Sequence, residues 1–241
     1  MKVFQKKRFD KAAARLLAAV MAIMACIGLT PPERTMAQGY GKDGVVRDIS
    51  SWDLIKDMGL GYNIGNTFDC IGSYITAATP EDYQRGWGND PVTKHYIDKV
   101  KEAGFKTIRL PVSWAQWLDG NNQVDPAYMA AVKEVVDWCM EDDFYVILNI
   151  HHDGGEADTS WIRNAASDYA GTLEKYKTIW GQIADTFAGY GDHLIFESMN
   201  EVCFPPLGMS RQYEILNGMN QAFVDTVRGK GGNNAGRHLL I

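Results

Sequence analysis

The sequence predicts an α/β fold of the (β/α)8-barrel type, of which about the first four βα units and the start of strand five are present. Short apolar segments alternate with amphipathic helical segments along the chain, which is the order typical of a parallel sheet. No hairpin signal of the Asn-Gly type joins two strands, since each connection is helical. Polar residues gather where the predicted strands end, and in a barrel those ends meet at one mouth.

The first 37 residues have the organisation of a secretory signal peptide. A basic region up to Arg15 precedes an apolar stretch at 16–29, and Thr35-Met-Ala37 supplies small residues for cleavage. The apolar stretch is shorter than the roughly 20 residues that a membrane-spanning helix needs. We therefore expect a secreted protein, with lipid attachment at Cys26 as a minor alternative.

Composition and charge limit the classes of partner that this chain is expected to bind. The 241 residues are 46% hydrophobic and 22% charged, as in ordinary globular proteins. Residues 1–37 carry seven basic and two acidic side chains, so the net charge of −6 becomes −11 for 38–241. Nucleic acid and anionic membranes repel such a chain, so neither is expected as a partner of the mature form. A neutral polymer is the more natural ligand.

Three cysteines remain after cleavage, namely Cys70, Cys139 and Cys203. None has CxxC spacing, which argues against a zinc knuckle or a thioredoxin-like site. Cys139 lies on the apolar face of a predicted helix and is expected in the core. A disulfide between Cys70 and Cys203 stays open, because both follow predicted strands and spacing cannot decide it.

The first part of the chain opens with a Gly-rich, flexible lead-in at 38–47. Residues 51–58 predict a short helix that closes one end of the barrel, and 61–67 predict the first strand. A long loop at 68–89 follows. We assign 48–241 to the N-terminal half of the barrel.

Two helices are expected to begin with the same device, an Asp as N-cap and a Pro at the first helical position. Asp90-Pro91 opens the first, which Gly104 ends, and Asp125-Pro126 opens the second. The strand between them covers 105–112.

The remaining segments repeat the alternation, with a near-continuous apolar run at 144–150 as the third strand. The later elements are a helix at 172–190, a strand at 194–196, a helix at 210–228 and the start of a strand at 238–241. A fifth strand with no residues after it leads us to expect that the barrel continues beyond Ile241.

Candidate site residues follow the strands in chain order. They are Asn63 and Asn66, then Arg109, then His151 and His152, then Asn200 and Glu201. Any one of them could serve a structural role, such as an ion pair for Arg109. Core packing, however, gives no reason for polar groups at four strand ends alike.

Loop tryptophans extend this candidate site. They are Trp87, Trp114, Trp117 and Trp161, all on the same predicted side of the sheet. Indole faces stack on the apolar C–H faces of sugar rings, so they suit a polysaccharide cleft. Packing within the loops is the alternative for each.

Five motifs in order resemble glycoside hydrolase family 5, and more narrowly its bacterial endoglucanase branch that includes xyloglucanases and lichenases. The motifs are Gly61-Tyr-Asn-Ile-Gly-Asn66, Trp87-Gly-Asn89, Thr107-Ile-Arg-Leu-Pro-Val-Ser-Trp114, Val146-Ile-Leu-Asn-Ile-His-His-Asp153 and Leu194-Ile-Phe-Glu-Ser-Met-Asn-Glu201. The resemblance covers about 45–241.

The resemblance implies roles for individual residues. Glu201 matches the general acid/base, and Asn200 would hydrogen-bond the sugar 2-hydroxyl. Arg109 matches the arginine that supports the nucleophile carboxylate. His151 matches the histidine that lines the subsite of cleavage, with His152 as a neighbour. Asn63, His152, Trp87, Trp114 and Trp161 are expected to bind substrate.

The same resemblance implies a retaining, two-carboxylate mechanism, with the two carboxyl groups about 5–5.5 Å apart. The family's nucleophile is a glutamate on the seventh strand, which this chain does not contain, and neither Glu197 nor Asp153 matches it. Val202 departs from the family, which usually has proline there. We therefore expect a secreted endo-β-1,4-glucanase that is monomeric when full length and uses no cofactor, and a fragment that is inactive alone.

Two alternatives remain. A non-catalytic carbohydrate-binding fragment would keep the aromatic cleft, although binding alone needs no general acid. A metal site of His151, His152, Asp153 and Glu201 is disfavoured, because adjacent histidines on a strand point in opposite directions.

Overall fold

The structure is a computed structural model that describes residues 44–241. The predicted signal peptide, Cys26 and positions 38–43 of the predicted lead-in lie outside these residues. Within 44–241, no helix combines the length and the apolar content needed to cross a bilayer.

Five parallel strands form one sheet in chain order, each paired with the next. They are β1 Gly61–Asn63, β2 Thr107–Leu110, β3 Tyr145–Asn149, β4 Leu194–Glu197 and β5 Leu239–Leu240. This confirms the predicted four βα units and the start of a fifth strand. The first strand ends at Asn63 rather than at 67, because Asn66 adopts a left-handed backbone (φ 58°) that cannot continue a strand.

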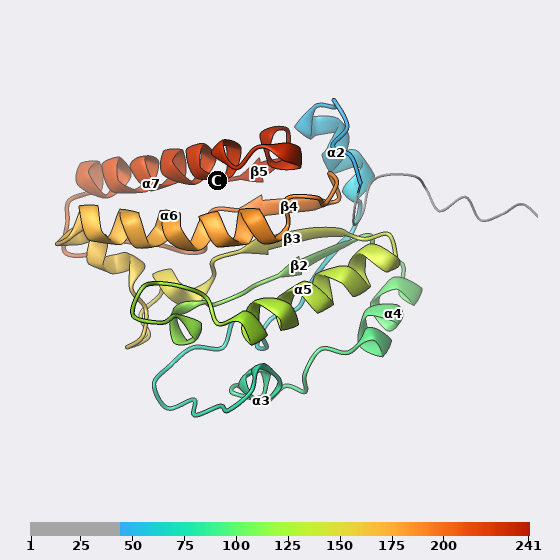
Figure 1. The fold of residues 1–241 in the computed structure, drawn as a ribbon, viewed down its shortest axis with the longest axis horizontal. Coiled ribbons are helices and arrows are strands. Elements are labelled where there is room, and N and C mark those ends of the chain that lie inside the picture. Colours follow the sequence, from blue (N-terminus) through green and yellow to red (C-terminus); the bar gives the residue numbers. More distant parts are fainter. Residues whose placement is uncertain (1–43) are drawn as a thin grey trace, which may run out of the picture. The chain divides into compact units, whose positions relative to one another are not determined.

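The helices separate the strands as the sequence predicts. They are α2 Ser51–Met58, α3 Pro80–Gln84, α4 Lys94–Glu102, α5 Pro126–Glu141, α6 Tyr169–Thr186 and α7 Met209–Gly229. Short 3-10 turns are η1 Ala115–Trp117, η2 His152–Gly154, η3 Ile162–Ala166 and η4 Gly232–Ala235. Figure 1 shows α6 and α7 side by side along the sheet.

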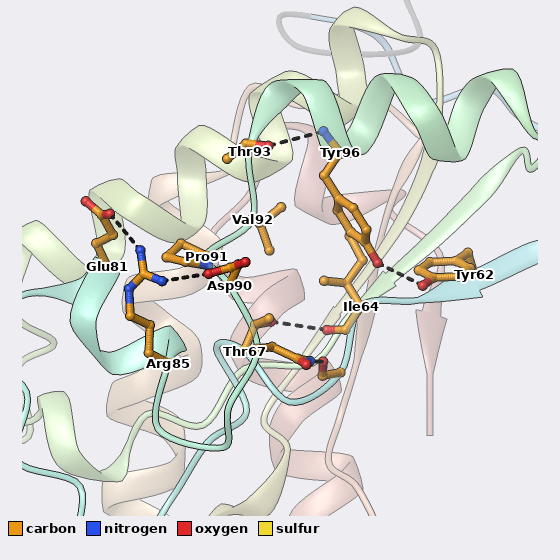
Figure 2. A pocket seen from close by; sticks show the side chains of 12 residues that line it. Tyr62, Ile64, Thr67, Glu81, Arg85, Asp90, Pro91, Val92, Thr93 and Tyr96 are labelled. Carbon is orange, nitrogen blue, oxygen red and sulfur yellow. Dashed lines mark hydrogen bonds and ion pairs between the residues drawn. The ribbon is translucent and has the colours of Figure 1, made fainter.

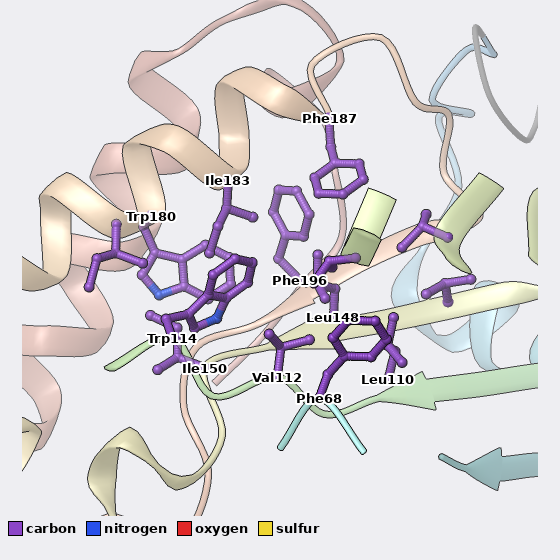
Figure 3. Close-up of a cluster of buried hydrophobic side chains, with 14 of the residues drawn as sticks. Phe68, Leu110, Val112, Trp114, Leu148, Ile150, Trp180, Ile183, Phe187 and Phe196 are labelled. Atoms are coloured by element: carbon purple, nitrogen blue, oxygen red, sulfur yellow. The ribbon is translucent and has the colours of Figure 1, made fainter. Parts of the chain in front are cut away.

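Alternate strand residues face opposite sides of the sheet. Figure 3 shows Ile183 of α6 and Phe187, which directly follows α6, on the side of the sheet that carries Leu148 and Phe196; all four belong to the main core between helices and sheet. Tyr145 and Ile195 instead pack with Leu54 of α2 in a second, smaller cluster. The helix at 51–58 therefore covers part of the opposite face, as expected for a helix that closes a barrel end.

Of the two helix starts predicted from an Asp-Pro pair, one is correct and one is wrong. Asp125 caps α5 as predicted, accepting hydrogen bonds from the N–H groups of Ala127 (2.8 Å) and Tyr128 (3.1 Å). Asp90 does not cap α4: Thr93 does, since its hydroxyl accepts the N–H of Tyr96 at 3.2 Å. A Thr N-cap three residues further on therefore replaces the expected Asp-Pro start.

Two other expectations need correction. The loop at 68–89 contains α3, which Thr79 caps by accepting the N–H of Asp82. The end of the lead-in is held in place, because Arg47 donates to Asp192 (2.5 Å) and Asn233 donates to the carbonyl of Gly44 (2.7 Å).

The cysteines of the described chain are all free. Cys70 and Cys139 are buried and Cys203 is exposed, so the disulfide that spacing left open is not formed. Cys139 lies in the core as predicted.

Candidate active site

Parallel pairing brings polar side chains to one face of the sheet. Arg109 of β2 is in register with Asn63 of β1 and with Ile147 of β3. Ile147 pairs in turn with Ile195 of β4, and Glu197 lies two residues after Ile195. Because side chains alternate along a strand, Glu197 shares the face that Arg109 occupies.

Arg109 is the centre of a hydrogen-bond network. Its Nε and Nη2 donate to the two carboxylate oxygens of Glu197 at 2.7 and 2.6 Å. Nη2 also donates to Asn200 Oδ1 at 2.9 Å, and Nη1 donates to Asn63 Oδ1 at 3.1 Å. The structure thus brings together three residues that the sequence singled out, and adds Glu197, for which it gave no role.

His151 is held as a neutral hydrogen-bond donor. The backbone N–H of Val112 donates to Asn149 Oδ1 at 3.2 Å, which turns Asn149 Nδ2 toward His151 Nδ1 at 2.9 Å. Since Nδ1 accepts this bond, the proton of the neutral ring lies on Nε2. Burial, with the charges of His152 and Arg109, lowers the pKa of His151 to about 3. The ring is therefore uncharged near neutral pH.

His152 connects the site to an aromatic loop. Its ring centroid lies 4.4 Å from that of His151 and 5.3 Å from that of Trp87. Its Nε2 is 3.8 Å from Asp69 Oδ2. Burial lowers the pKa of His152, although the carboxylates of Asp69 and Glu201 oppose that shift. Glu201 is thus close enough to His152 to influence its charge.

Asp69, His151 and His152 offer ligand atoms that all lie within 4.8 Å of one another. The premise that the two histidines point in opposite directions is wrong, because they follow β3 and His152 begins a 3-10 turn. The bond from Asn149, however, leaves the proton of His151 on Nε2, so no ring nitrogen of His151 is free to bind a cation. One imidazole and one carboxylate are fewer ligands than a zinc site uses.

The segment that carries Glu201 is closely packed from one side. Glu201 is exposed and has a left-handed backbone (φ 45°), which is uncommon for a residue other than glycine. A Cβ on Gly154 would lie 2.4 Å from Val202 Cγ2 and 3.4 Å from the carbonyl oxygen of Asn200. The loop after β3 therefore lies against both neighbours of Glu201.

Asp153 joins two loops at the site. Its carboxylate is fully buried and accepts hydrogen bonds from the backbone N–H of Trp114 (2.9 Å) and from Trp161 Nε1 (2.7 Å). Burial raises its pKa to about 6, against the effect of these bonds. A carboxylate enclosed in this way positions the loops after β2 and β3 and does not reach a substrate.

Three of the four tryptophans expected in a cleft are buried or stacked within the protein. Trp114 is fully buried and donates from Nε1 to the carbonyl of Asn149 at 3.1 Å. Trp161 is 5% exposed, and Trp117 stacks face to face on Tyr128 with centroids 4.8 Å apart. The expectation that Trp114 and Trp161 bind substrate is therefore wrong, because their indole faces are already covered.

Trp87 keeps its place beside the site and has a partner that the sequence reading missed. Trp87 is half-buried, and its Nε1 donates to the hydroxyl of Tyr74 at 2.6 Å. Tyr74 is 69% exposed and lies in the same long loop. The sequence signal that could have identified Tyr74 is an aromatic residue in a polar loop that follows a strand.

A hollow of about 700 Å³ lies outside this site, along the edge strand β1. Figure 2 shows Tyr62 of β1 bonded to Tyr96 of α4, with Arg85 between Glu81 and Asp90. Neither Glu201 nor Arg109 lines it, and neither do the three side chains bonded to the guanidinium. Its lining of paired charges and tyrosine hydroxyls does not make it the candidate active site.

Comparison with known proteins gives concordant matches. A family model described as "Cellulase (glycosyl hydrolase family 5)" matches residues 66–241. Endoglucanase A of Clostridium longisporum is 41% identical over 202 residues, which cover 80% of this chain and 38% of that protein. Endoglucanase B of Ruminococcus albus is 41% identical over 201 residues, which cover 80% of this chain and 46% of that protein.

Solved structures agree. A glycoside hydrolase family 5 enzyme from Prevotella bryantii, in complex with a xyloglucan tetradecasaccharide, is 37% identical with a TM-score of 0.76, covering 81% of this chain and 57% of that one. A broad-specificity endoglucanase from Clostridium longisporum is 40% identical with a TM-score of 0.72, covering 80% of this chain and 56% of that one. The chain thus spans less than two thirds of each of these relatives.

Proposed function

The chain belongs to the cellulase family, glycosyl hydrolase family 5, and on that premise we propose that it forms the N-terminal half of the catalytic barrel of an endo-β-1,4-glucanase. The observation that carries this proposal is the network of Arg109 with Glu197, Asn63 and Asn200 directly before Glu201. Binding a polysaccharide does not require such a site.

In this proposal Glu201 is the acid/base of a retaining mechanism. It protonates the leaving glycosidic oxygen while a second carboxylate about 5–5.5 Å away attacks the anomeric carbon. Glu197 is engaged with Arg109 and Asp153 is enclosed, so neither supplies that carboxylate. We place the nucleophile in a segment outside these 241 residues, and the 241 residues alone are then inactive.

The substrate class is a β-glucan. One relative is titled as a complex with a xyloglucan oligosaccharide and another as a broad-specificity endoglucanase. We extend this class to the present protein, with cellulose and xyloglucan as substrates. Asn200, Asn63 and His151 supply hydrogen-bond donors for sugar hydroxyls, and Trp87 supplies an aromatic face.

The test is Glu201→Gln in the complete natural protein, assayed on soluble cellulose and xyloglucan. Loss of the general acid should lower kcat by about 10²–10⁴-fold. Glu214→Gln, which breaks an exposed pair with Arg211 on α7, is the matched control and should keep full activity. Undiminished hydrolysis by Glu201→Gln would reject the acid assignment, and glucan binding without hydrolysis by the wild type would favour the carbohydrate-binding alternative.

Export is proposed on the organisation of residues 1–37 alone. The mature N-terminus of the secreted protein should lie close to Gln38. A lipid-modified N-terminus at Cys26 would replace this proposal by membrane anchoring.

A further inference from the structure

Glu197, the last residue of β4, is 9% exposed and faces the site without a role in the mechanism above. Each of its carboxylate oxygens accepts a hydrogen bond from Arg109, at 2.7 and 2.6 Å. This bidentate arrangement uses the fork of the guanidinium and fixes its plane as well as its position. A lysine or a single-point contact would leave that plane free to turn.

The orientation of Arg109 determines the orientation of two amides. A guanidinium has only donors, so the atoms of Asn63 and Asn200 that face it are their oxygens. The amide nitrogen of each side chain is then turned away from Arg109, as a donor for another partner. Among the described residues, one Nη1 hydrogen of Arg109 also has no acceptor, and it is available to a ligand or to a second carboxylate.

Glu197 itself is poorly placed to attack a sugar. Both of its oxygens are engaged with a cation, and swinging the carboxylate toward a substrate would break two short, charge-assisted hydrogen bonds at once. It also lies four residues before Glu201, inside the sheet rather than in the loop beyond it.

We propose that Glu197 is a positioning residue, which locks the guanidinium of Arg109 so that Asn63 and Asn200 present their N–H donors to the bound β-glucan. This inference rests on the proposed function for its substrate. The hydrogen bonds between Glu197 and Arg109 do not depend on the proposed function.

The kinetic test uses Glu197→Gln and Glu197→Asp in the complete protein. Glu197→Gln should lower kcat on xyloglucan by about 100-fold with little change in KM, since misplaced site groups cost mainly transition-state stabilisation. Glu197→Asp keeps the charge and should recover part of this loss. In a background of Arg109→Lys, Glu197→Gln should have almost no further effect, because both changes remove the same interaction.

Two further variants distinguish a positioning role of Glu197 from a role in stability or in direct attack on the sugar. Asp192→Asn removes a buried partner of Arg47 far from the site, and it should lower stability without a selective loss of kcat. Azide added to Glu197→Ala should give no glycosyl azide, because that product forms only where the missing carboxylate attacks the sugar itself. Additive losses with Arg109→Lys, or a glycosyl azide product, would overturn the proposal.

A measurement on the complete natural protein tests the pair without relying on activity. The Nε–H proton of Arg109 should exchange slowly with water in NMR spectra, and Glu197→Gln should make its exchange fast while Glu214→Gln leaves it unchanged. Fast exchange in the wild type would reject the locked pair. Slow exchange in a protein without glucanase activity would reject the proposed function and leave the pair established.

Discussion

At the scale of single residues, the site presents mainly hydrogen-bond donors. Arg109 turns the amide nitrogens of Asn63 and Asn200 outward, and Asn149 leaves the proton of His151 on Nε2. Sugar hydroxyls and carboxylates accept such donors. The local chemistry therefore suits a neutral polyol next to an anionic catalytic group.

The neutral His151 gives the protein a pH-dependent stability. The folded-state pKa of about 3 lies below the ordinary 6.5, so the unfolded chain binds more protons between these values and stability falls as pH drops below 6.5. Between pH 7 and pH 5 this loss amounts to about 2 kcal/mol. In His151→Asn the free energy of unfolding, measured with urea, should fall correspondingly less over this range.

The control for that experiment is His95→Asn, since His95 is exposed on α4. It should show the wild-type pH dependence. Equal pH dependence in wild type and His151→Asn would mean that folding does not lower the pKa of His151.

Trp87 should contribute to substrate affinity through its indole face. Trp87→Ala should raise KM for xyloglucan about 2- to 10-fold, because an aromatic contact is worth about 0.5–1.5 kcal/mol. Trp52→Ala is the matched control: Trp52 is 77% exposed but belongs to α2, before the first strand. Equal KM values for the two variants would remove Trp87 from the binding site.

On the scale of elements, the loops after β2, β3 and β4 hold one another. Asp153 joins the first two by bonds to Trp114 and Trp161, and Gly154 lies against the segment that contains Glu201. Glu201, the proposed acid, thus lies in a segment that is packed against the loop of a neighbouring strand.

Gly154→Ala tests that packing. The added methyl group would overlap Val202 Cγ2, so the side chain that directly follows Glu201 must shift, and kcat should fall about 10- to 100-fold. Gly229→Ala, at the end of α7 where a Cβ meets nothing within 4 Å, should leave kcat unchanged. Full activity of Gly154→Ala would show that this loop does not position the acid.

On the scale of the described chain, 44–241, a buried cation ties the last strand to the rest of the sheet. Arg237 is fully buried and donates to the carbonyls of Phe187, Tyr190, Gly191 and Leu194. These carbonyls lie between the end of α6 and the start of β4. Arg237 itself lies two residues before β5. Its guanidinium also lies 4.8 Å from the centroid of the Phe196 ring.

Arg237→Met should therefore destabilise the protein strongly. It removes five buried hydrogen bonds that the guanidinium donates, four of them to backbone carbonyls, which should cost on the order of 3 kcal/mol or more in the free energy of unfolding. Arg211→Met, at an exposed position on α7, should change the urea midpoint little. Similar midpoints for the two variants would contradict this account of Arg237.

Much of this architecture could be predicted without coordinates. Short apolar runs located the four strands after the first, and the Asp125-Pro126 pair located the start of α5, because these signals lie within a few neighbouring residues. The same local logic failed at Asp90, where Thr93 competes for the cap, and in the loop where Thr79 starts α3. Local signals do not show which of two nearby capping residues begins the helix.

The sequence by itself determined the order of the elements, the edge of the sheet where polar residues gather and the resemblance that singles out Glu201. Only the tertiary structure decided which indoles are covered, as for Trp114, and that Glu197 is the partner of Arg109. Burial and long-range pairing depend on register between strands that are 88 residues apart in the chain, as Arg109 and Glu197 are. No local pattern records such a distance, because every strand alternates in the same way.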